Sequence, residues 1–178
     1  MAGKWQLPVI YICENNQYGM SVSIKRACAD TDICGRGRMY AMQVAKVDGQ
    51  QVLEVRDAVL EAAERARTGG GPTLIEAVTY RYRGHSRSDP RAYRTKEEEE
   101  HWQGRDPILL FKQDLLEDGT LTEEAFEKLQ VEVDEAVAEA ERFAVEESPY
   151  PDPSEVLDDV YAGWIETEKG LVRTDTKG

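Results

Sequence analysis

The sequence predicts an α/β fold built on a parallel sheet and followed by a helical C-terminal region. Three observations predict it: an apolar run at residues 7–13 (LPVIYIC), a strand, helix, strand pattern over residues 43–82, and helical apolar spacing after residue 95. A strand that is buried on both faces of a parallel sheet is apolar throughout, and a crossover helix joins parallel neighbours. With 178 residues and 40% apolar side chains, the chain can bury a core.

The first half alternates strands with a helix. After the run at residues 7–13, a polar loop rich in Gly, Asn and Arg is expected to reach residue 39. Residues 43–47 predict a second strand, which ends at the turn pair Asp48-Gly49. Apolar residues then recur at helical spacing from residue 52 until GGGP at residues 69–72 ends the helix, and residues 73–82 (TLIEAVTYRY) predict a third strand. The order implies a parallel βαβ unit.

The second half carries two short helices. Thr95 and Glu98 have the spacing of a capping box, which predicts a helix that ends near residue 102. Asp106-Pro107 supplies a cap and a first-turn proline for a helix over residues 108–116, and Gly119 ends it.

A long amphipathic helix is expected after Thr122. Its outer face is acidic, and the proline-rich segment 149–153 ends it. A short apolar piece at residues 156–161 follows, and the last dozen residues are expected to be frayed. One apolar stripe runs along the helix: Phe126, Leu129, Val133, Ala136, Ala140 and Phe143.

Composition excludes several classes of protein. Residues 1–94 hold 14 Lys and Arg against 10 Asp and Glu, whereas residues 95–178 hold 8 against 25, so the net charge is −13. An acidic chain is a poor ligand for nucleic acid, because affinity there comes from neutralised phosphates. No apolar run approaches the roughly 20 residues that span a bilayer. Three cysteines (Cys13, Cys28 and Cys34) without CxxC spacing argue against a disulfide framework or a zinc site and indicate a reducing compartment.

The segment ENNQYGM at residues 14–20 is the first candidate site. It lies directly after the first strand, and ligands bind at the carboxyl ends of strands in open parallel sheets. Asn amides and backbone carbonyls are neutral oxygen ligands that suit Mg²⁺. The alternative is an ordinary turn, because Asn and Gly favour turns, and position alone favours this alternative.

The second candidate is the loop at residues 81–94, directly after the third strand. It holds five arginines and one acid, a density that suits anionic oxygens such as phosphates. Gly84, before His85, would let the backbone approach a ligand closely. The alternative is that these arginines pair with the acidic half of the chain. The acidic run 97–100 is expected to be a solvated face without a catalytic role, and His101 is expected to be structural.

Three segments together resemble a known family. ENNQYGMSVSIKRA, VDGQQV and GPTLIEAVTYRYRGHSRSDPRAYRTKEE, in this order, are similar to the C-terminal half of the α subunit of thiamine-diphosphate-dependent 2-oxo acid dehydrogenases, the E1 component. Bacterial acetoin and pyruvate dehydrogenase α chains resemble it most, over residues 1–162. The resemblance implies the C-terminal part of a doubly wound parallel-sheet fold at residues 1–94, a helical region at 95–162 and a flexible tail at 163–178.

The resemblance also implies site residues. Asn16 would give its side-chain oxygen, and Tyr18 its backbone carbonyl, to Mg²⁺. His85 would be the catalytic residue that reaches the diphosphate of the cofactor, while Arg81, Arg83 and Arg94 would order its loop. Ser86 matches a position that is phosphorylated in mitochondrial relatives, but regulation there is not expected.

The implied function is that of an oxidoreductase. The family cleaves acetoin or oxidatively decarboxylates pyruvate and passes the resulting unit to a lipoyl group on an E2 partner. The active site lies at the interface with an E1 β subunit in an α2β2 heterotetramer. The implied location is the cytoplasm of a bacterium, or the mitochondrial matrix in a eukaryote, without membrane or nucleic-acid partners.

One departure from the family pattern limits this expectation. The family motif opens with Gly-Asp-Gly upstream of the Asn-Asn pair, and this sequence has no such motif before Asn15. The chain alone is therefore expected to be inactive and to bind thiamine diphosphate very weakly. The segment at residues 31–45 also fits the family poorly. Two alternatives stay open: half of a split enzyme, or a non-catalytic module for subunit contact. The sequence does not distinguish acetoin from pyruvate.

Overall fold

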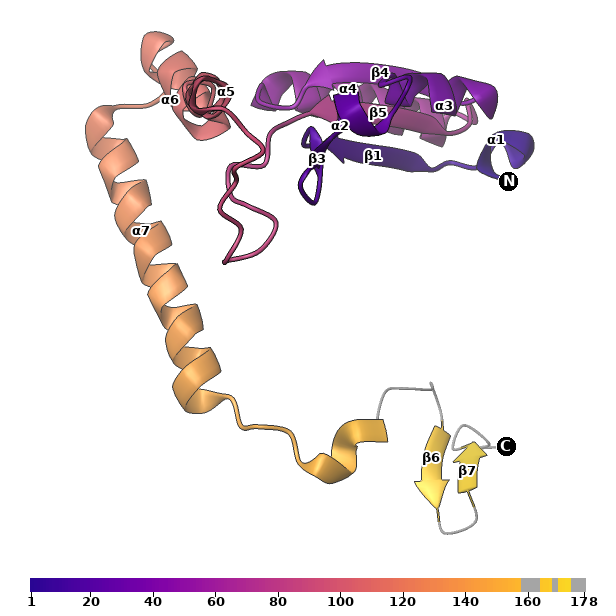
Figure 1. The fold of residues 1–178 in the computed structure, drawn as a ribbon, viewed down its shortest axis with the longest axis vertical. Coiled ribbons are helices and arrows are strands. Elements are labelled where there is room, and N and C mark those ends of the chain that lie inside the picture. Colours follow the sequence, from indigo (N-terminus) through magenta and orange to yellow (C-terminus); the bar gives the residue numbers. More distant parts are fainter. Residues whose placement is uncertain (158–163, 168–169, 174–178) are drawn as a thin grey trace. The chain divides into compact units, whose positions relative to one another are not determined.

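The computed structural model describes residues 1–157, 164–167 and 170–173 (Figure 1). The chain divides into two units, Met1–Glu123 and Glu124–Gly178. The change in composition near residue 94 is thus not the boundary between the units. The reason lies in packing, because a helix after that position stacks its Trp102 ring on Tyr80, which lies just beyond the sheet, with 5.2 Å between centroids.

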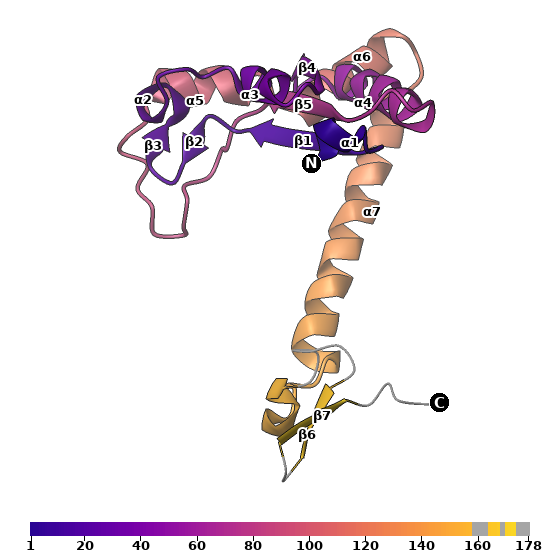
Figure 2. The same cartoon turned by 90° about the vertical axis from the view of Figure 1, so that its right-hand side faces the viewer.

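A three-stranded parallel sheet organises the first unit. Its order is β1 (Ile10–Asn15), β5 (Thr73–Val78), β4 (Gln43–Asp48) (Figure 2). The predicted parallel pairing is confirmed. Asn15 and Asp48 both pair with Val78 in the register, so the three strands end level with one another. The segments that leave the carboxyl ends of these strands therefore start at one edge of the sheet.

Helices cover both faces of the central strand. In β5, Ile75 and Glu76 are successive residues with 0% exposure, and successive side chains point to opposite faces. The helices that contact β4 and β5 are α3 (Ile33–Met39) and α4 (Val52–Arg67). The predicted helix after residue 52 is confirmed. It ends before Gly69 and Gly71, whose φ angles of 79° and 80° suit glycine.

The prediction of a loop up to residue 39 is wrong. The segment holds a short hairpin of β2 (Tyr18–Gly19) and β3 (Val22–Ser23), then α2 (Ile24–Ala27) and α3. Two glycines lower the helix propensity of α3, which hid it in the sequence. Tertiary packing explains the helix: a Cβ at Gly37 would lie 2.8 Å from Val44 Cγ1, so only glycine permits this close approach to the sheet.

Strand β1 is less buried than its apolar sequence predicts. The run at residues 7–13 begins with a connection from α1 (Ala2–Trp5), and the strand starts at Ile10. Tyr11 and Ile12 are 43% and 53% exposed. The expectation of a strand covered on both faces is therefore wrong for the described residues, in which β1 is an edge strand with β5 as its one neighbour.

Two short helices complete the first unit, α5 (Lys96–Gln103) and α6 (Pro107–Glu117). Both predicted caps are confirmed. Thr95 Oγ1 accepts from the Glu98 amide at 3.1 Å, and Asp106 Oδ1 accepts from the Ile108 amide at 2.9 Å. Gly119, at φ 76°, lies just beyond the end of α6 as predicted.

The long helix α7 (Glu123–Arg142) confirms the prediction after Thr122, and all of it except Glu123 belongs to the second unit. A π-helical turn (Phe143–Glu147) and a 3₁₀ turn (Pro153–Leu157) come next. Strand β6 (Trp164–Thr167) then pairs antiparallel with β7 (Gly170–Arg173), where a tail without regular structure was expected. Of the apolar piece at 156–161, residues 158–161 lie outside the described residues. Within the described part, no helix is both long and apolar enough to cross a bilayer.

Candidate functional site

A buried pair of polar residues fixes the turn after β1. Asn15 is 8% exposed, and its Nδ2 donates to Glu76 Oε1 on β5 at 2.8 Å. Lys46 Nζ on β4 lies 3.2 Å from the same oxygen. The other side of the Asn15 amide, Oδ1, accepts from the Gln17 amide at 3.2 Å. One side chain thus joins the sheet to the turn.

Asn16 forms the next bond of the turn. Its Oδ1 accepts from the Tyr18 amide at 3.0 Å, so the side chain closes an Asx turn. Gln17 and Met20 have φ angles of 70° and 53°, a left-handed conformation that costs about 1–2 kcal/mol for a residue with a Cβ. The segment is therefore a turn, as the simpler reading of the sequence proposed, and it is held in a strained shape.

Asn16 Oδ1 and the backbone carbonyl oxygen of Tyr18 fit part of a magnesium shell. An amide oxygen has two lone pairs, so the bond from the Tyr18 amide leaves Asn16 Oδ1 able to bind a cation. Hard neutral oxygens suit Mg²⁺, which normally also takes one or two carboxylates and phosphate oxygens. Asn16 and the Tyr18 carbonyl would thus supply two ligands of such a shell, and the carboxylate would come from another segment.

The Tyr18 side chain points into a cluster of aromatic rings. Its hydroxyl donates to Glu98 Oε1 at 2.7 Å, and the Tyr80 hydroxyl donates to the same oxygen at 3.0 Å. Burial, followed by the bond to Glu98, raises the pKa of Tyr18 to about 12. The same causes raise the pKa of Tyr80. Both hydroxyls therefore stay protonated at neutral pH and hold α5 against the turn.

Arg94 occupies the centre of this cluster. It is 9% exposed, and its guanidinium carbon lies 4.5 Å from the ring centroid of Tyr18, 5.0 Å from that of Tyr80 and 5.4 Å from that of Tyr93. Its Nη1 donates to the backbone carbonyl of Arg81 at 2.5 Å. A buried cation surrounded by aromatic faces gains cation–π energy that offsets its loss of water. Arg94 thus supports the loop, as the resemblance implied.

Arg81 connects the turn after β1 to the histidine loop, which is the segment 81–94 that carries His85. Its backbone amide donates to the Asn16 carbonyl at 3.4 Å, and its Nη2 donates to the Met20 carbonyl. Its Nη1 lies 3.4 Å from His85 Nδ1. The guanidinium therefore lies between the two candidate segments and contacts both.

Asp89 shapes the loop that carries His85. Its carboxylate accepts from the His85 amide at 2.8 Å, the Arg91 amide at 2.9 Å and the Tyr93 hydroxyl at 2.7 Å. These bonds, with that from Tyr93 the strongest, lower the pKa of Asp89 to about 2. A Cβ at Gly84 would lie 2.7 Å from Asp89 Cβ. In this structure, Gly84 therefore permits the loop to close on itself, whereas the sequence suggested approach to a ligand.

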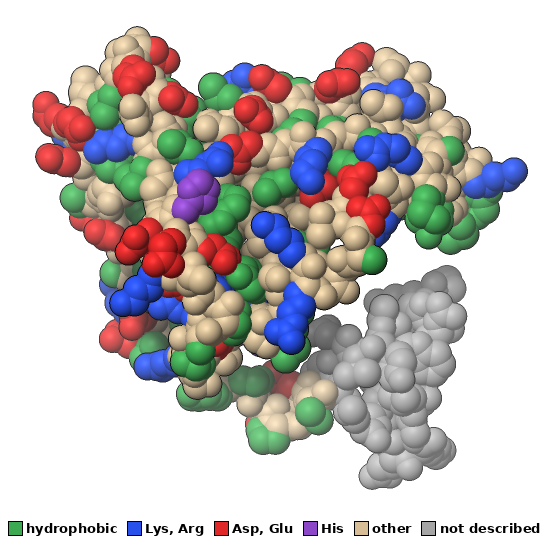
Figure 3. Space-filling view, turned by 45° about the horizontal axis from the view of Figure 1, so that its top comes forward, with side chains coloured by type: hydrophobic (Ala, Val, Ile, Leu, Met, Phe, Trp, Pro, Cys, Tyr) green, Lys and Arg blue, Asp and Glu red, His purple; other side chains and the backbone are tan. Residues whose placement is uncertain are grey.

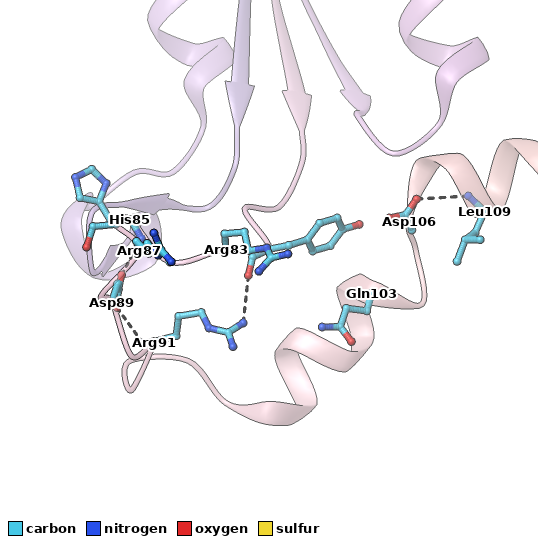
Figure 4. Close-up of a pocket in the computed structure, with 11 residues that line it drawn as sticks. Arg83, His85, Arg87, Asp89, Arg91, Gln103, Asp106 and Leu109 are labelled. Atoms are coloured by element: carbon cyan, nitrogen blue, oxygen red, sulfur yellow. Dashed lines mark hydrogen bonds between the residues drawn. The ribbon is translucent and has the colours of Figure 1, made fainter. Parts of the chain in front are cut away.

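The loop lines a cavity of about 870 Å³ (Figure 4). Three of its arginines, Arg83, Arg87 and Arg91, border it together with His85. Arg91 pairs with Glu99 at 3.2 Å, as the alternative reading of the arginines proposed. Among the described residues, Arg83 and Arg87 have no ion-pair partner. Two unpaired guanidiniums therefore remain beside His85 for an anionic ligand.

The predicted site residues do not share one cavity. His85 borders the large cavity, at the end of the group away from Gln103, Asp106 and Leu109 in Figure 4. Asn16 and Tyr18 border a separate one of about 350 Å³. Arg81 contacts Asn16, which borders the smaller cavity, and His85, which borders the larger one.

Glu98 is the positioning residue that sequence reasoning missed. It was assigned to a solvated acidic face, yet its carboxylate joins Tyr18 to Tyr80. The cap spacing from Thr95 located it at the start of a helix but gave no sign of its partners, which are distant in sequence. On the face that Figure 3 shows, charges of both signs are interspersed.

Comparisons with known proteins agree on one family. The family model described as "Dehydrogenase E1 component" matches residues 1–154. The pyruvate dehydrogenase E1 component subunit alpha of Rhizobium meliloti is 44% identical over 161 residues, which cover 90% of this chain and 46% of that protein. Subunit alpha of the acetoin:2,6-dichlorophenolindophenol oxidoreductase of Bacillus subtilis is 42% identical, over 96% of this chain and 50% of that protein. A chloroplastic pyruvate dehydrogenase E1 subunit alpha-3 of Oryza sativa is 41% identical, over 91% and 38%. The chain thus spans half the length of these relatives or less.

Proposed function

Since the chain belongs to the dehydrogenase E1 component family, we propose that it provides the C-terminal half of an E1 α subunit that uses thiamine diphosphate and Mg²⁺. The named relatives act on pyruvate or acetoin, and either is the proposed substrate here. When bound, thiamine diphosphate supplies the chemistry that cleaves the bond beside a carbonyl group.

One observation carries the assignment of residues: Arg81 contacts both the turn after β1 and His85. Asn16 Oδ1 and the Tyr18 carbonyl would hold Mg²⁺, and His85 would donate to an oxygen of the diphosphate. Arg83 and Arg87 border the same cavity as His85 and would add positive charge near those oxygens. Arg81 would keep the two segments at the distance that the ligand requires.

The remaining partners belong to the same proposal. An E1 β subunit would complete the active site, and a lipoyl-bearing E2 would receive the product. Within the described turn and loop, the partner of Asn16 Oδ1 is the Tyr18 amide and not a carboxylate. The magnesium carboxylate is therefore expected from the part of the relatives that this chain does not span.

Calorimetry tests the roles of the site residues. The sample is a complete α–β complex that contains this sequence, titrated with thiamine diphosphate in the presence of Mg²⁺. Asn16→Ala and His85→Gln should each raise the Kd by about tenfold or more. The matched control is His101→Gln, because this second histidine lies on α5 and borders neither cavity. Unchanged affinity in both site variants would reject the assignment. A pyruvate and acetoin panel with the same complex identifies the substrate.

The long helix supports subunit contact as a second function. Its apolar stripe follows spacings of three and four residues, which is the pattern of a helix that packs on another helix. Leu129 and Val133 are 49% and 56% exposed in that stripe. The double variant Leu129→Glu/Val133→Glu should lower the mass of the assembly in sedimentation. Val131→Glu, an exposed apolar position outside the stripe, should leave it unchanged; equal behaviour of the two variants would exclude this role.

A further inference from the structure

Three potential metal ligands meet at the start of α3, and none of them is a residue proposed for the cofactor. They are Asp32, Cys34 and Glu76, and one ligand atom of each lies within 4.8 Å of the other two. Cys34 is 2% exposed and Glu76 is 0% exposed, while Asp32 is half-buried. The spacing of the cysteines in the sequence argued against a zinc site. Tertiary folding, however, brings one cysteine beside two carboxylates.

A second observation points to a ligand. Glu76 Oε1 is occupied, because Asn15 Nδ2 and Lys46 Nζ both contact it. Glu76 Oε2 is buried and accepts no hydrogen bond of ordinary geometry from a described residue, while the neighbouring Cys34 thiol donates to the Ala45 carbonyl at 3.4 Å. A carboxylate oxygen in that state is costly, since burial removes its water without replacing it. A cation at the cluster would satisfy it.

We propose that Asp32, Cys34 and Glu76 form a binding site for a borderline-soft divalent cation, and that this cation is Zn²⁺ under physiological conditions. Thiolate sulfur favours Zn²⁺ over the hard cations Mg²⁺ and Ca²⁺. Three protein ligands leave a fourth tetrahedral position for water. Ligand atoms in a tetrahedral zinc shell are about 3.3–3.8 Å apart, so the cluster needs to contract by about 1 Å.

Neighbouring charges balance such a site. A divalent ion with one thiolate and two carboxylates has a net charge of −1, and two cations lie beside it. Lys46 contacts Glu76, and Arg38 Nη1 lies 3.0 Å from Asp32 Oδ2. When the metal–sulfur bond forms, the Cys34 thiol releases its proton to water, so no oxidant or reductant is required.

The cluster also has an entry path. Asp32 borders a surface cavity of about 410 Å³ together with Cys28 and Arg36. Gly35 leaves room for the Asp32 carboxylate, because a Cβ there would lie 3.1 Å from Asp32 Oδ2. An ion can therefore reach the half-buried Asp32 carboxylate from this cavity, which Cys34 and Glu76 do not border.

Cobalt spectroscopy tests the proposal on the full 178-residue chain. Co²⁺ replaces Zn²⁺ and shows a thiolate charge-transfer band in the near ultraviolet when it binds sulfur. One molar equivalent should produce the band, and Zn²⁺ should remove it by displacement. Cys34→Ser should abolish the band. Cys13→Ser and Cys28→Ser are matched controls and should keep it, since neither sulfur belongs to the cluster.

A further variant guards against loss of folding. Asp32→Asn changes a half-exposed side chain, so circular dichroism should stay native while the Kd for Co²⁺ rises by about tenfold or more. The proposal is overturned if the native chain shows no thiolate band, if the band persists in Cys34→Ser, or if Asp32→Asn binds as tightly as the native chain.

Discussion

The Asn15 side-chain amide donates to Glu76 Oε1 across 2.8 Å, and both residues are buried. The register places them on adjacent parallel strands, β1 and β5, although 61 positions separate them in sequence. Because Asn15 Oδ1 also caps the adjoining turn, this bond fixes the position of Asn16 relative to the sheet.

Asn15→Ala should destabilise the first unit more than Asn16→Ala does. The first change leaves Glu76 with one partner fewer in a buried site, which costs about 1–3 kcal/mol. The second removes a half-buried bond to the Tyr18 amide and should cost about 1 kcal/mol or less. Urea denaturation gives both free energies of unfolding. Equal losses would show that burial of the Glu76 pair does not dominate the stability of this turn.

Arg94→Lys should lower the free energy of unfolding by about 1–2 kcal/mol. Lysine cannot present a planar cation to Tyr18 and Tyr80 while it also donates to the Arg81 carbonyl. The control is Arg87→Lys in the same loop, where the described residues offer no ion pair and the change should stay within about 0.5 kcal/mol. A control variant as unstable as Arg94→Lys would contradict a specific role for the aromatic cluster.

The stability of the first unit should fall at alkaline pH because of Tyr18. Its pKa rises from 10.0 to about 12 on folding, so the folded state holds the proton more tightly than the unfolded state. The stabilisation is therefore complete below pH 10 and is lost as pH rises toward 12.

Tyrosinate absorbance measures this titration. Glu98→Gln should bring the pKa of Tyr18 closer to its ordinary value, because it removes the charge beside the hydroxyl and keeps an acceptor. Burial, the larger cause, remains, so part of the shift should persist. Glu97→Gln on the same helix turn should leave the absorbance curve unchanged, and a shift of the same size there would exclude a specific bond.

The histidine loop should lose its shape only in strong acid. The pKa of Asp89 is lowered from 3.8 to about 2 on folding, so its contribution is present above pH 3.8 and is lost as pH falls through about 2. Asp89→Asn should shift the amide resonance of His85 at neutral pH, because the carboxylate no longer accepts its hydrogen bond. Asp118→Asn, after α6, should not move that resonance; a loop unaffected by Asp89→Asn would refute the role of Asp89.

Local signals in the sequence determined the strands β4 and β5, the helices α4 to α7, their caps at Thr95 and Asp106, and the family through its motifs. Each signal spans a few neighbouring residues, so it can be recognised without knowledge of the rest of the chain. Helix α3 lacked such a signal, because its two glycines lower the helix propensity of the segment. One of them, Gly37, permits α3 to pack closely on the sheet.

Only the tertiary structure decided which side chains meet. Parallel register placed Asn15 beside Glu76, folding of α5 onto the first unit gave Glu98 its two tyrosines, and packing of α3 brought Cys34 close to Glu76. The same structure showed that the apolar strand β1 has an exposed edge in the described chain. These contacts join residues far apart in sequence, and they depend on strand order and helix packing, which local periodicity does not encode.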